Sequence, residues 1–96
     1  LNKIRNSIYS GAMKVLTDKQ IKHHMAANLR RMLESRGWSQ SELHRRSGVN
    51  NMTISEVIRG ETVPGIGVAS RIADALDVTI DKLISAPPEN SSRKAS

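Results

Sequence analysis

The chain has no cysteine and no phenylalanine, and its only aromatic residues are Tyr9 and Trp38. Without cysteine it can form neither a disulfide framework nor a thiolate metal site, which is compatible with a reducing cytoplasm. Leu, Ile, Val, Met and Ala must fill the interior, and this composition suits short, closely packed helices better than extended sheet. No apolar run approaches membrane-spanning length, and no signal-peptide pattern is visible. We therefore expect a small all-α protein, and its composition is compatible with a cytoplasmic location.

Catalytic and metal-binding patterns are also lacking. His23, His24 and His44 do not have the spacing that brings histidine ligands onto one metal ion. No nucleophile elbow or glycine-rich phosphate loop frames the serines and aspartates. We expect no enzyme activity, no metal and no cofactor, and we interpret the three histidines as surface residues.

The length of the chain limits the size of its core, and its charge indicates a class of binding partner. Ninety-six residues can support one modest core. The formal net charge of +6 is unevenly placed, because residues 1–59 contain 11 Lys and Arg against 4 Asp and Glu, whereas residues 60–96 contain 4 against 5. A basic field of this kind attracts DNA, and the attraction falls steeply with salt. Many small proteins are basic for solubility alone, so the charge supports nucleic-acid binding without establishing it.

Apolar residues at helical spacing predict a first helix between Thr17 and Gly37. Thr17 and Gln20 form a capping box at its start. Its apolar stripe comprises Ile21, Met25, Leu29, Met32 and Leu33. We expect its arginines to be solvated, namely Arg30, Arg31 and Arg36. Trp38 is expected to fill the joint with the next helix. Two further helices are predicted near the C-terminal end, from about residue 66 to 76 and from Thr79 to about residue 84.

Residues 39–60 predict two short helices joined at Gly48. Ser39 and Glu42 form a second capping box, so one helix begins at Gln40. Gly48 allows a left-handed end to that helix, and Asn50 is a good N-cap for a helix that runs to about residue 59. The apolar residues assigned to the core are Leu43, Val49, Ile54, Val57 and Ile58. The opposite face of the second helix carries Asn51, Met52, Ser55, Glu56 and Arg59. Taken alone, such a polar face would simply meet water.

This stretch resembles the helix-turn-helix of the lambda-repressor-like (Cro/CI, or XRE-type) DNA-binding family. The matching residues are Ser39-Gln40, Glu42-Leu43, Gly48-Val49, Thr53-Ile54-Ser55, Gly60, Pro64, Ile72-Ala73-Asp74-Ala75-Leu76 and Val78-Thr79-Ile80-Asp81-Lys82-Leu83. The resemblance covers roughly residues 20 to 85. It implies an all-α, five-helix bundle, most like the N-terminal domain of a phage or prophage repressor, whose second motif helix lies in the major groove.

The resemblance also implies roles for individual residues. Expected base contacts are Asn51, Met52, Ser55 and Glu56, because Asn pairs with adenine, Glu accepts from the cytosine amino group and Met contacts a thymine methyl. Expected contacts to the DNA backbone are Gln40, Asn50, Thr53 and Arg59. His44 stands where the family usually has a small residue, so either the two helices cross more widely or the imidazole points outward.

The chain divides into three parts. Residues 1–16 are expected to be a flexible N-terminal extension or a cloning-derived segment, 17–85 the DNA-binding domain, and 86–96 a Pro/Ser-rich linker or tail, beyond which a C-terminal domain is conceivable. A homodimer on double-stranded operator DNA is expected to use Ile80, Leu83 and Ile84. Two alternatives remain open: an antitoxin that grips a toxin and regulates its own operator, and a helical scaffold that binds membrane or acidic protein.

Overall fold

The computed structural model describes residues 16–88, and within this range the chain forms five helices and no strand. The helices are α2 (Asp18–Arg36), α3 (Gln40–Ser47), α4 (Asn51–Ile58), α5 (Ile66–Leu76) and α6 (Ile80–Ile84). Each lies where the sequence predicts a helix, so the all-α, five-helix prediction is confirmed. Residues 1–15 of the predicted extension (1–16) and residues 89–96 of the predicted tail (86–96) lie outside the described residues.

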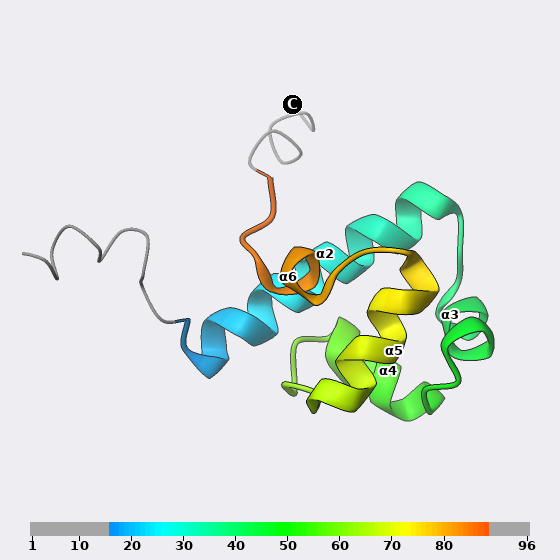
Figure 1. Ribbon diagram of the computed structural model, residues 1–96, viewed down its shortest axis with the longest axis horizontal. Coiled ribbons are helices and arrows are strands. Elements are labelled where there is room, and N and C mark those ends of the chain that lie inside the picture. Colours follow the sequence, from blue (N-terminus) through cyan, green and yellow to red (C-terminus); the bar gives the residue numbers. More distant parts are fainter. Residues whose placement is uncertain (1–15, 89–96) are drawn as a thin grey trace, which may run out of the picture.

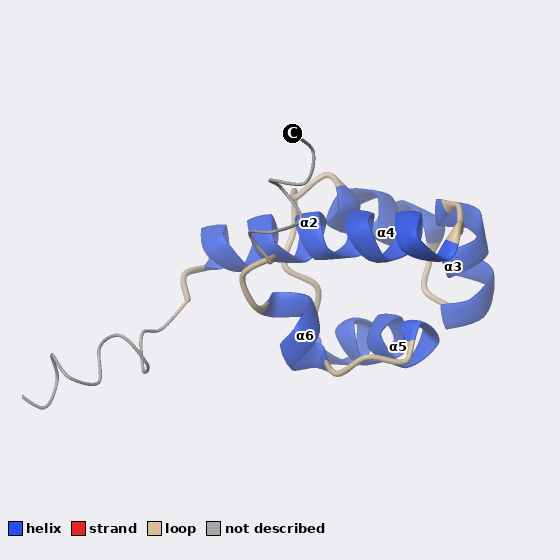
Figure 2. Ribbon diagram, turned by 90° about the horizontal axis from the view of Figure 1, so that it is seen from above, coloured by secondary structure: helices blue, strands red, loops and turns tan. Residues whose placement is uncertain are grey.

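Helix α2 is the longest of the five helices (Figure 1). Helices α4 and α6 both pack against α2, while α3 packs against α4 and α5, and α5 also contacts α6. Figure 2 shows α2 beside α4 on one side of the domain and α5 with α6 on the other, with α3 at the end. None of the helices in residues 16–88 combines the length and apolarity needed to cross a membrane.

Aliphatic side chains and methionine fill the core, as the composition predicts. The buried hydrophobic residues are Met25, Ala26, Leu29, Met32, Leu33, Leu43, Val49, Ile54, Val57, Ala69, Ile72, Ala73, Leu76 and Leu83. Trp38 packs against the edge of this cluster, which confirms its predicted packing role, and Arg46 lies over its ring at 4.2 Å from the centroid. Ile58 was predicted to be a core residue and is only half-buried, because it ends α4 at the margin of the cluster.

The two predicted capping boxes differ in the structure. At α2 the box is complete: the amide of Gln20 donates to Thr17 Oγ1 at 3.1 Å, and the amide of Thr17 donates to the Gln20 side chain at 2.9 Å. At α3 only half forms. Ser39 Oγ accepts from the amide of Glu42, but the Glu42 carboxylate turns to the guanidinium groups of Arg45 and Arg46. Hydrogen bonds from Arg45 and then Arg46 lower the pKa of Glu42, because they stabilise the ionised carboxylate.

Two exposed arginines of α2 also contact the ends of other helices. Arg30 donates to the carbonyl of Ile58 at 2.8 Å, and Arg36 donates to the carbonyl of Leu76 at 2.7 Å. These carbonyls lie in the last turns of α4 and α5, where no amide of the same helix follows to donate to them. A cation there also interacts favourably with the helix dipole. Both arginines are exposed, as predicted, and their contacts with these carbonyls are an addition that the sequence did not predict.

Asn28 donates to backbone carbonyls at the end of α6, and sequence reasoning did not predict this role. It is 1% exposed, and its Nδ2 donates to the carbonyls of Leu83 at 2.7 Å and Ser85 at 2.8 Å. Its Oδ1 accepts from Arg31, which is not simply solvated. A buried asparagine is stable only when its amide is paired, and the end of α6 supplies the acceptors.

The histidines were interpreted as surface residues, and His24 departs from that. Its Nδ1 lies 2.9 Å from the carbonyl oxygen of Ile84, so this half-buried ring also helps to end α6. His44 is exposed, and its Nδ1 lies 2.7 Å from the carbonyl of Val49. Of the two arrangements open for His44, the outward-pointing imidazole is therefore the one observed. No group of acidic residues and histidines within residues 16–88 is placed to hold a metal ion.

Candidate nucleic-acid interface

The turn between α3 and α4 fixes the direction in which α4 is presented. Gly48 ends α3 with φ of 75°, a left-handed conformation that glycine adopts without steric cost. Val49 then enters the core, with 2% of its surface exposed. Asn50 caps α4 by accepting from the amides of Met52 at 2.7 Å and Thr53 at 3.4 Å. The left-handed glycine, the buried valine and the capped helix start together define the geometry of the pair, as predicted.

One face of α4 is buried and the other is open. Ile54 and Val57 are 0% and 1% exposed, so the inward face is fully used by the core. The outward face borders a shallow hollow of about 410 Å³. Its lining comprises Gln40, Asn51, Met52, Ser55, Glu56 and Arg59. The structure thus brings together six of the eight residues that the sequence assigned to DNA, while Asn50 and Thr53 lie outside this lining.

Gln40 and Asn51 are joined across the two helices. The Nε2 of Gln40 donates to the side-chain oxygen of Asn51 at 2.9 Å and to its backbone oxygen at 3.2 Å. An amide oxygen has two lone pairs, so this oxygen can accept one further hydrogen bond. Among residues 16–88 nothing accepts from the Asn51 Nδ2. The first helix of the pair therefore orients the opening side chain of the second and leaves a donor and an acceptor for a ligand.

Arg59 ends the open face and is tied to its own neighbours. Its guanidinium donates to Ser55 Oγ at 2.6 Å and makes two bonds to the Glu61 carboxylate, at 2.8 and 3.1 Å. These bonds raise the pKa of Arg59 and lower the pKa of Glu61, because each charge stabilises the other. Sequence reasoning missed Glu61. The signal was Gly60, whose φ of 73° turns the chain back so that two residues of opposite charge meet.

Met52 is the most unusual member of the face. It is 66% exposed, although a large apolar side chain gains nothing from water. Within residues 16–88 only Val63, at 36%, and Ile66, at 73%, are comparably exposed hydrophobic residues. An exposed methionine between hydrogen-bonding side chains is typical of a surface that meets both apolar and polar groups of a partner.

The residues predicted for a dimer interface are only partly available. Leu83 is fully buried in the core of the single chain, so it offers no surface to a second copy. Ile80 and Ile84 are half-buried and pack against the same core. The prediction for Leu83 is corrected because α6 uses this residue to dock on α2. The apolar surface that α6 leaves for a partner is limited to the outer parts of Ile80 and Ile84.

A helical pair with one buried and one open face, set on a five-helix bundle, defines a helix-turn-helix domain. The family model HTH_3, described as helix-turn-helix, matches residues 29–83. This range is more than half of the chain, and the chain belongs to the HTH_3 helix-turn-helix family, which confirms the XRE-type resemblance.

Two relatives are named as regulators of transcription. The chain is 40% identical over 57 residues to the HTH-type transcriptional regulator y4dL of Sinorhizobium fredii, covering 59% of this chain and 29% of that protein. It is 30% identical over 63 residues to the HTH-type transcriptional regulator SutR of Escherichia coli, covering 66% of this chain and 35% of that protein. The chain thus spans about a third of the length of these relatives.

Two solved structures share the fold. An HTH_3 family transcriptional regulator from Vibrio cholerae superposes with a TM-score of 0.65 at 28% identity, covering 70% of this chain and 38% of that one. A hypothetical transcription factor from Neisseria, NHTF, superposes with a TM-score of 0.68 at 26% identity, covering 83% of this chain and 92% of that one. The bundle seen here is therefore similar in sequence and in structure to proteins of this family.

Proposed function

We propose that this chain is the DNA-binding part of a transcriptional regulator and that α4 enters the major groove of double-stranded operator DNA. The observation that carries the proposal is the outward face of α4, where Asn51 and Met52 are exposed and Glu56 is half-exposed while the opposite face is buried. The major groove admits an α-helix and displays donors, acceptors and thymine methyl groups. The open side chains supply a counterpart to each of these features.

The side chains that we propose to contact the DNA bases differ in chemistry. Asn51 retains a donor and an acceptor, so it can pair with the edge of adenine. Glu56 accepts only and suits the amino group of cytosine, while Met52 suits a thymine methyl. Ser55 accepts from Arg59 and keeps its own hydroxyl proton for a base.

The remaining side chains are assigned to the DNA backbone, which positions the protein without specifying sequence. These are Gln40, Asn50, Thr53 and Arg59. In this role Gln40 contacts the DNA backbone and also holds the side chain of Asn51 in place. Gln40 therefore links the position of the protein along the DNA to the contact that Asn51 makes with a base. We infer that a homodimer in the bacterial cytoplasm uses this surface and represses transcription, since occupation of an operator is sufficient to block a promoter.

The proposal is tested by replacing one base reader and one backbone contact. Asn51→Ala is expected to cost about 1 to 3 kcal/mol on the cognate site and to relax preference at one base position, whereas Arg59→Ala weakens all duplexes similarly. Sites selected from random duplexes, followed by titration of cognate and unrelated DNA, give both quantities. Arg71→Ala is the matched control, because Arg71 is an exposed arginine of α5 outside the open face.

Two results would contradict the proposal. Equal losses for Asn51→Ala and Arg59→Ala, with base preference unchanged, would remove the division of roles between bases and backbone. If the unaltered protein bound no duplex at low salt, the proposal that it binds DNA would be wrong, because a phosphate-dominated complex is strongest at low salt.

A further inference from the structure

A second hollow, of about 310 Å³, lies between α2 and the end of α4. Its lining comprises Lys19, Lys22, His23, Ala26, Arg30, Arg59 and Gly60. Five of these residues lie on α2. Lys19, Lys22, Ala26 and Arg30 follow one another at steps of three or four, so they form one stripe along a single face of the helix, and His23 lies beside it. Sequence reasoning did not assign a role to this stripe.

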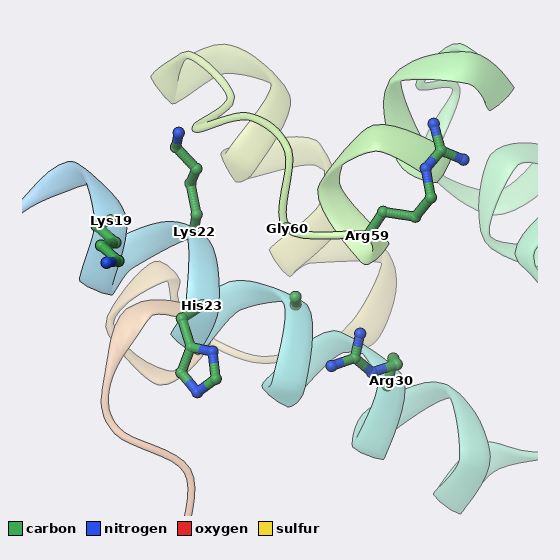
Figure 3. Close-up of a pocket in the computed structure, with 7 residues that line it drawn as sticks. Lys19, Lys22, His23, Arg30, Arg59 and Gly60 are labelled. Carbon is green, nitrogen blue, oxygen red and sulfur yellow. The ribbon is translucent and has the colours of Figure 1, made fainter.

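Two small residues form the floor of the hollow. A Cβ placed on Gly60 would lie 3.6 Å from the Cβ of Ala26, so the turn after α4 rests directly on α2. Larger side chains at these two positions would fill the space. Figure 3 shows Lys22 and Arg30 on either side of the Gly60 turn, while the Arg59 side chain extends away from α2 toward the open face of α4. Lys22 and Arg30 therefore flank a small, open floor.

Of the lysines and arginines that line this hollow, only Arg59 has a carboxylate partner within the described part of the chain. The ion pairs among residues 16–88 are those of Glu42 with Arg45 and Arg46, and of Arg59 with Glu61. Lys19, Lys22 and Arg30 thus have no carboxylate partner there. Arg30 is also held in place, because its Nη1 donates to the Ile58 carbonyl at 2.8 Å, and the residue as a whole is exposed. A positioned guanidinium that lines the same hollow as two lysines provides donors and positive charge for a tetrahedral oxyanion.

The hollow is continuous with the proposed recognition surface. Arg59 lines both hollows, so it stands at their junction. A helix in the major groove lies between two phosphate backbones, and contacts to them set the register of the protein. A cationic hollow next to the end of α4 is placed to meet one of those backbones.

We propose that this hollow binds a phosphate group of the DNA backbone, held by Lys19, Lys22 and Arg30, and that it thereby fixes the depth and register of α4. The inference rests on the proposed function, because it takes the phosphate from the duplex that α4 reads. A free phosphate or a phosphorylated small molecule has the same chemistry, and the experiment must distinguish these sources.

The experiment compares the double variant Lys19→Gln/Lys22→Gln with Lys82→Gln, a control at an exposed lysine of α6 outside both hollows. Affinity for cognate and unrelated duplexes is measured at several salt concentrations, and thermal melting checks that each variant folds. Each lost phosphate contact reduces the slope of log K against log salt by about 0.9. We expect a reduction of about this size in the double variant, equal weakening of cognate and unrelated DNA, and an unchanged slope in the control.

The outcomes separate the two proposals. If the unaltered protein selects its cognate site but the double variant keeps the slope of the Lys82→Gln control, the phosphate site is overturned and the proposed function stands. If the unaltered protein binds no duplex, both fail together. Titration with inorganic phosphate, followed by NMR at the Gly60 amide, identifies the source. Tight saturation in the micromolar range with an unchanged DNA slope would assign the hollow to a free anion, whereas weak binding together with the reduced slope supports the DNA backbone.

Discussion

At the scale of single residues, Arg59 is already occupied before any DNA is present. Its guanidinium makes a two-point contact with the Glu61 carboxylate, the geometry with which arginine also binds phosphate. The Glu61 carboxylate therefore binds Arg59 in the same way as the DNA phosphate that Arg59 is proposed to contact. Because Arg59 lowers the pKa of Glu61, the carboxylate stays ionised throughout the neutral range and the contact persists there.

Glu61→Gln is accordingly expected to strengthen DNA binding. The substitution frees Arg59 and removes a negative charge near the backbone, so cognate and unrelated duplexes should both bind about two- to fivefold more tightly at neutral pH, in keeping with the modest strength of exposed ion pairs. Fluorescence titration of both duplexes provides the measurement. Glu34→Gln makes the same charge change at an exposed position of α2 and controls for net charge. A decrease in affinity, or equal increases in the two variants, would show that Glu61 does not compete for Arg59.

The residues of the open face could be predicted, but their partners could not. Helical spacing alone places Asn51, Met52 and Glu56 opposite the apolar stripe, because a helix has one fixed period. The contact of Gln40 with Asn51 joins the first residues of α3 and α4, which are 11 positions apart in the sequence. The contact of Arg59 with Glu61 depends on the turn at Gly60 and on rotamers, which no spacing rule fixes.

At the scale of elements, α2 acts as a support for the ends of the other helices. Arg30 holds the last turn of α4 and Arg36 that of α5, while Asn28 holds the end of α6. Sequence patterns predicted the helices because caps and apolar periods are local. They did not predict these side-chain contacts, since Asn28 and Leu83 are 55 positions apart and nothing local relates them.

Asn28→Ala should therefore loosen α6 more than the rest of the domain. The change leaves buried carbonyls at the end of α6 without a donor, at a cost of about 1 to 3 kcal/mol in the free energy of unfolding. Chemical denaturation measures the loss, and amide exchange should accelerate in α6 more than in α4. Ser35→Ala, at an exposed position of the same helix, should stay within about 0.5 kcal/mol of the unaltered protein. Uniform acceleration across all helices would contradict a local role for Asn28.

At the scale of the whole molecule, one copy is too small to specify an operator. α4 has 8 residues and is about 12 Å long, so it can read only a few base pairs. Two copies related by a two-fold axis, with their reading helices about 34 Å apart, would meet successive major grooves on one side of the duplex. Because Leu83 is buried, the surface left on α6 for pairing is small, and we expect two copies to associate weakly unless DNA holds them together.

This expectation predicts cooperative binding that depends on spacing. A symmetric duplex with half-sites about 10 base pairs apart, centre to centre, should bind two copies cooperatively, and adding about five base pairs should abolish the cooperativity by rotating one site to the other side. Replacing Ile80 and Ile84 by serine should also reduce it, because these side chains are the apolar surface that α6 leaves half-exposed. Unchanged affinity of that variant for an isolated half-site would show that it remains folded. Cooperativity that persists at both spacings, or in the serine variant, would place the contact between copies elsewhere on the molecule.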